Sequence, residues 1–101
     1  MAKERRRPEA KAAAEALAVQ ALTFLAGEPA RLGRFLAETG IGPQAIRTAA
    51  QEPGFLAGVL GFILADESLL IAFAGEAGVK PPEVGRAHAV LAGPAWEPEA
   101  P

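Results

Sequence analysis

The sequence repeats itself with an offset of 38 residues, so that residues 21–49 align with residues 59–87. The repeat predicts an architecture rather than a reaction, because its matched positions are apolar anchors and the glycines and prolines that end or begin helices. Eight of the 29 aligned pairs are identical: Leu22/Leu60, Phe24/Phe62, Leu32/Leu70, Phe35/Phe73, Glu38/Glu76, Gly40/Gly78, Pro43/Pro81 and Ala49/Ala87.

Composition indicates that the repeated elements are helices. Half of the 101 residues are hydrophobic, and alanine, the best helix former, supplies much of this fraction, while β-branched residues are few. A chain of this length folds as one domain with a modest core. We therefore expect an all-α fold: a compact six-helix domain built from two pseudo-repeated three-helix units.

Glycines and prolines divide the chain into six expected helices. The first begins near Pro8, the fifth is capped by Asp66 or Ser68, and Gly40 and Gly78 end the second and fifth in a left-handed conformation. The fourth is apolar around nearly its whole circumference, which predicts the central, most buried helix. The expected ranges are about 8–26, 30–39, 43–51, 54–65, from the Asp66 corner to residue 77, and 81–92.

Charge and proline content set the expected boundaries of the domain. Residues 1–11 carry five basic and two acidic side chains, whereas the remaining 90 residues carry five basic and ten acidic ones. We predict a basic, disordered arm over residues 1–11 and a helical domain over residues 12–92, with units of about 12–52 and 53–92. Residues 93–101 form a proline-rich tail in which only Trp96 is suited to docking.

The turn around Gly78 resembles the core of a DNA-binding helix-turn-helix. Ala74, Val79 and Val84 occupy its small and apolar positions. In this interpretation Arg86 and His88 face the nucleic acid, and Arg5, Arg6 and Arg7 of the arm contact phosphates. The acidic body opposes that reading, since it repels the duplex. A helical corner without DNA contact explains the same residues.

Catalytic and cofactor sites are not expected. There is no cysteine, His88 is the only histidine, and no glycine-rich phosphate loop follows a strand. We therefore predict no catalytic residue, no cofactor and no metal ligand. The uncharged run over residues 55–65 is too short to cross a bilayer, so we expect no membrane partner.

Residues 22–92 resemble a family of small bacterial proteins classed as a domain of unknown function. The recurring elements are Phe24-Leu25-Ala26, Pro29, Arg34-Phe35-Leu36, Thr39-Gly40, Pro43, Arg47, Pro53, Phe55-Leu56, Asp66-Glu67, Phe73-Ala74, Gly78 and Pro82. The resemblance implies a cytoplasmic all-α domain and brings no activity, ligand or catalytic residue.

We predict a non-catalytic protein-interaction domain with an adaptor or regulatory role, which binds a protein partner or a second copy of itself. Leu69, Leu70, Ile71 and Phe73 cannot all point one way on a helix, and Ile71 is left for the surface. The alternative is a DNA-binding helix-turn-helix regulator. A third possibility, a small-molecule binding domain, requires an apolar pocket with converging polar groups.

Overall fold

A computed structural model describes residues 2–93, with the side chains of residues 2–8, Pro43 and Pro53 left out. The tail beyond Gly93, including Trp96, lies outside the described residues. The described part contains six α-helices and no strand, which confirms the predicted all-α, six-helix fold. The helices are α1 (Ala2–Ala26), α2 (Pro29–Thr39), α3 (Ile46–Ala49), α4 (Pro53–Leu64), α5 (Glu67–Ala77) and α6 (Pro81–Ala92), with a 3₁₀ turn, η1 (Pro43–Ala45), before α3.

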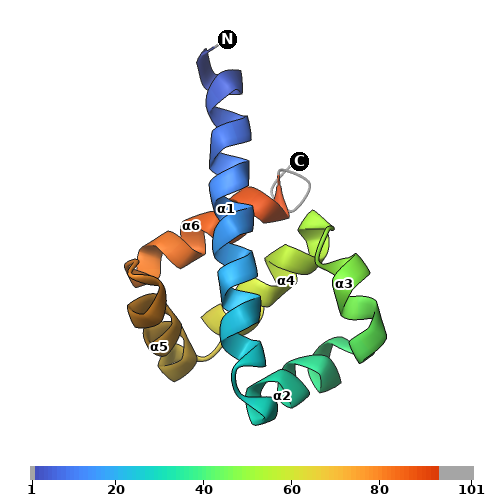
Figure 1. The fold of residues 1–101 in the computed structure, drawn as a ribbon. Coiled ribbons are helices and arrows are strands. Elements are labelled where there is room, and N and C mark those ends of the chain that lie inside the picture. The colour runs from blue at the N-terminus through green and yellow to red at the C-terminus, as the bar shows by residue number, and fades with distance from the viewer. Residues whose placement is uncertain (1, 94–101) are drawn as a thin grey trace, which may run out of the picture.

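Helix α4 lies at the centre of the fold, as its apolar circumference predicts. Helices α1 and α6 both pack on it and on each other, and α1 crosses in front of both (Figure 1). Helices α5, α2 and α3 surround this crossing (Figure 1). The side chains of α4 that are buried in the core are Leu56, Ala57, Val59, Leu60 and Ile63.

Left-handed glycines end α2 and α5, as predicted. Gly40 has a φ of 75° and Gly78 a φ of 74°, a region that only glycine occupies without steric penalty. The N–H of Gly40 donates to the carbonyl of Leu36, and the N–H of Gly78 donates to that of Ala74. These bonds satisfy carbonyls that the helix ends would otherwise leave free.

The repeat is visible in the helix boundaries but not in the packing. Shifting α2 by 38 residues gives the bounds of α5, and the ends of α1 and α4, Ala26 and Leu64, have the same offset. The third elements differ, because α6 packs extensively on α1 and α4 whereas α3 is a single turn that has few contacts with α1. The prediction of two equivalent three-helix units is therefore not confirmed.

The predicted helix over residues 43–51 is wrong in length and type. The segment is a 3₁₀ turn followed by the single turn of α3. None of the side chains described in this segment is fully buried, and its predicted anchor, Ile46, is only half-buried. Gln51 and Glu52 donate their backbone N–H groups to carbonyls three residues back, which tightens the chain before α4 begins. With so little apolar surface to bury, local turn geometry decides the conformation.

Helix α1 is longer than predicted. It begins at Ala2 rather than near Pro8, so the helix also includes residues 2–7. Pro8 lies inside it, where its missing N–H removes one helical hydrogen bond. Ala14 is the first buried residue along the helix. The N-terminal part of α1 consequently stands clear of the other helices (Figure 1), and the molecule measures 44 × 27 × 25 Å.

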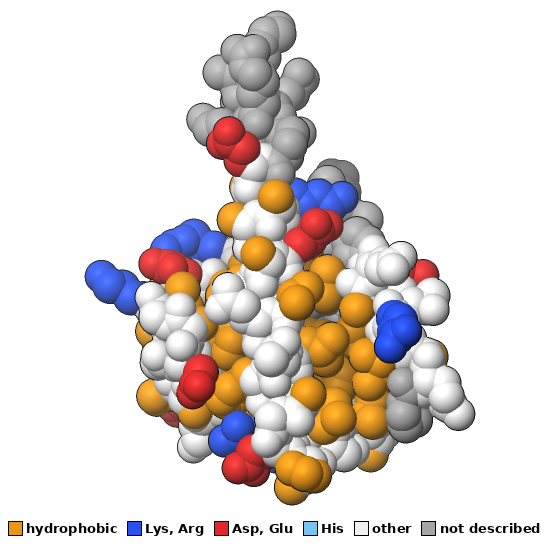
Figure 2. Space-filling model, viewed as in Figure 1, with side chains coloured by type: hydrophobic (Ala, Val, Ile, Leu, Met, Phe, Trp, Pro, Cys, Tyr) orange, Lys and Arg blue, Asp and Glu red, His pale blue; other side chains and the backbone are white. Residues whose placement is uncertain are grey.

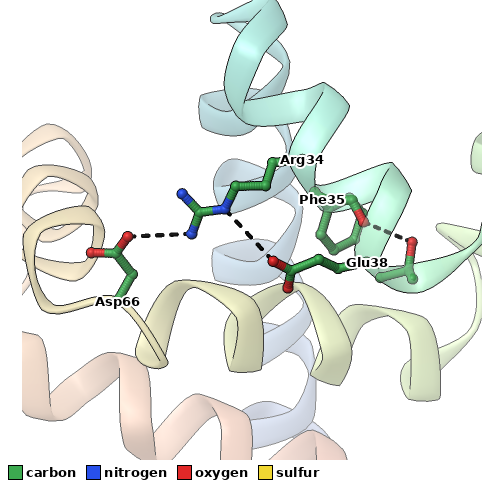
Figure 3. A network of polar contacts seen from close by, with 5 residues as sticks. Arg34, Phe35, Glu38 and Asp66 are labelled. Atoms are coloured by element: carbon green, nitrogen blue, oxygen red, sulfur yellow. Dashed lines mark hydrogen bonds and ion pairs between the residues drawn. The ribbon is translucent and has the colours of Figure 1, made fainter.

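One polar junction ties α2 to the corner between α4 and α5 (Figure 3). The Arg34 guanidinium donates to the Asp66 carboxylate at 3.3 Å and lies 3.7 Å from Glu38 on its own helix. The same guanidinium lies 5.1 Å from the centre of the Phe62 ring. Asp66 also accepts a hydrogen bond from the backbone N–H of Leu69 at 3.2 Å, which makes it the N-cap of α5, one of the two residues predicted for that role.

The Asp66 junction predicts a pH-dependent stability. The Leu69 N–H and the Arg34 guanidinium hold the pKa of Asp66 below its ordinary value of 3.8. A depressed carboxylate pKa contributes stability that is fully present above the unfolded value and is lost as the pH falls through the folded value. We expect Asp66→Asn, which keeps a capping oxygen, to be less stable than the wild type at neutral pH and to match it at pH values well below 3.8.

Thermal unfolding of both proteins across that pH range measures the difference. Glu52→Gln is the matched control, because Glu52 precedes α4 without a side-chain capping bond. A gap between wild type and Asp66→Asn that persists unchanged into strong acid would contradict the assignment.

Candidate protein-interaction surface

A groove runs along one side of α1, between this helix and α5 and α6. It consists of two open hollows of about 500 and 560 Å³ that adjoin at Gln20. We call the two together the α1 groove. Its α1 wall is formed by Ala10, Ala13, Ala14, Ala16, Leu17, Val19, Gln20, Thr23 and Phe24. Its other wall and lower rim are formed by Gly27, Glu28, Arg31, Phe73, Glu76, Ala77, Val79, Glu83, Arg86, Ala87 and Val90.

The part of the groove between α1 and α5 has an aromatic floor. The rings of Phe24 and Phe73 lie 5.5 Å apart in a tilted arrangement, and the Arg31 guanidinium covers the Phe24 ring at 4.4 Å. Such a cation–π contact holds the arginine across apolar surface. Glu28 and Glu76 also line this part, so its rim is predominantly acidic.

The part between α1 and α6 is lined mostly by small apolar side chains. Leu17, Val79 and Val90 are its largest aliphatic residues, and Val90 is 40% exposed. Glu83 and Arg86 are the charged residues that line it, one of each sign. Figure 2 shows hydrophobic side chains gathered on both sides of α1 on this face of the molecule.

The outer face of α1 lacks the charges of an ordinary surface helix. No charged residue lies between Glu15 and Glu28, although Val19, Gln20 and Thr23 are exposed. Val19 alone is 46% exposed. A helix on the surface of a globular protein normally presents a polar face to water, and one that is apolar on all sides is normally buried. This face of α1 therefore has the character of a contact surface.

Sequence reasoning did not identify Val19 or the groove beside it. The signal was available, because the stretch between Glu15 and Glu28, about three helical turns, carries no charge on any side. The groove itself depends on how α5 and α6 lie against α1, which the local sequence does not specify. Ile71, the residue predicted to remain at the surface, is 57% exposed, as expected, but it does not line the groove.

The predicted nucleic-acid residues are not brought together into a basic patch among the described side chains. Arg86 is exposed, but the groove that it lines also contains Glu83. His88 is half-buried, and a Cβ placed on Gly61 would lie 3.4 Å from its Nε2. The backbone of Arg5, Arg6 and Arg7 is part of α1, but the structure does not describe their side chains. The DNA-binding alternative stays a prediction.

Two further findings concern metals and membranes. Within residues 2–93, no group of three or more His, Asp or Glu side chains is placed to hold a metal ion. In the same part of the chain, no single helix has the length and apolarity to cross a membrane, and only Gly54–Leu64 and Glu67–Ala77 taken as a pair, bent by 113°, pass that test by composition. The cytoplasmic location stays a prediction.

The fold and the groove together define a small six-helix domain with an unpartnered helix face. The chain belongs to the family described as protein of unknown function (DUF3572), whose model matches residues 11–94. This agrees with the resemblance read from residues 22–92. No curated protein and no solved structure matches the chain.

Proposed function

We propose that the chain is a non-catalytic protein-interaction domain and that it binds its partner through the α1 groove. The observation that carries the proposal is the uncharged, exposed face of α1, with Val19 at its crest beside an open groove. Removing such apolar surface from water contributes about 25 cal/mol per Å². A face with this composition on a surface helix is typical of a site that another protein covers.

The shape of the groove suits an extended apolar ridge, such as one face of an amphipathic helix. Its floor includes the half-buried Phe24 ring, and aromatic side chains are common anchors in protein interfaces. Arg31 lies over the Phe24 ring, and Glu28, Glu76, Glu83 and Arg86 also line the groove. Charged groups of this kind orient a partner, while apolar contacts supply the affinity.

Val19→Asp tests this proposal. Because Val19 is exposed in the free protein, the substitution is expected to leave folding within about 0.5 kcal/mol of the wild type. In the complex it places a charge in a desolvated contact, so we expect about tenfold or greater loss of partner binding. The measurement is quantitative mass spectrometry of proteins captured from extracts of the source cells by immobilised wild type and variant.

Ile71→Asp is the matched control, because it introduces the same charge at an exposed apolar residue outside the groove. Partners retained by Ile71→Asp and lost by Val19→Asp support the proposal. Equal capture by wild type and Val19→Asp, with circular dichroism showing both folded, would contradict it.

A further inference from the structure

We draw no further inference here: the strongest candidate, the α1 groove between α1 and helices α5 and α6, belongs to the site already described, and nothing in the structure shows what covers it.

Discussion

Replacing Phe35 by alanine is expected to lower the free energy of unfolding by about 3–5 kcal/mol, the range for large-to-small changes at buried aromatic residues. Phe35 is fully buried, and its ring meets the rings of Phe55 and Phe62 edge-on at 5.8 and 5.3 Å. These contacts connect α2 to the central helix α4. Since small domains have only about 5–15 kcal/mol of stability in total, the variant is expected to be barely folded at 37 °C.

Urea unfolding followed by circular dichroism measures this loss. Phe24→Ala is the comparison, because Phe24 is only half-buried and lies at the groove, so its truncation leaves a smaller void and a smaller loss. Phe35→Leu is expected to fall between the wild type and Phe35→Ala. A loss below about 1 kcal/mol for Phe35→Ala would show that α2 is not held by this cluster.

Enlarging Ala18 to leucine is expected to destabilise the fold by about 1–3 kcal/mol through overpacking. Ala18 and Ala21 are completely buried where α1 crosses the core, and their small side chains allow the helix to lie close to its neighbours. A leucine there has no space unless α1 moves outward, and any such movement also widens the α1 groove.

The control for Ala18→Leu is Ala37→Leu, the same substitution at an exposed position of α2. We expect its stability to stay within about 0.5 kcal/mol of the wild type. Thermal and urea unfolding of both variants provide the comparison. If Ala18→Leu were as stable as Ala37→Leu, the crossing of α1 over the core would be looser than its burial indicates.

Much of the helix layout could be predicted because glycine, proline and capping residues act locally. Gly40 and Gly78 adopt the left-handed conformation expected of them, and Asp66 caps α5, since these roles depend on a few neighbouring residues. The same reasoning failed for residues 43–51. There the local signals for a helix were present, but the segment carries too little apolar surface for packing to stabilise a longer helix.

The candidate site could not be predicted to the same degree. The sequence suggested an exposed apolar side chain at Ile71, and Ile71 is exposed, yet the groove formed elsewhere, around Val19, Phe24 and Val90. A groove requires two walls, and its walls here come from α1 at one end of the chain and from α5 and α6 at the other. Periodicity within one helix reports its apolar face but not which neighbour covers that face.

By itself the sequence determined the all-α class, the central place of α4, the 38-residue offset of the helix boundaries and the ends of α2 and α5. Those features follow from the conformational limits of the backbone and from burial of the most apolar segment. Both depend on short stretches of the sequence. Only the tertiary structure decided that α6 packs on α1 and α4 while α3 does not take the equivalent place. That choice, and the groove that results from it, depends on how side chains distant in sequence fit together in space.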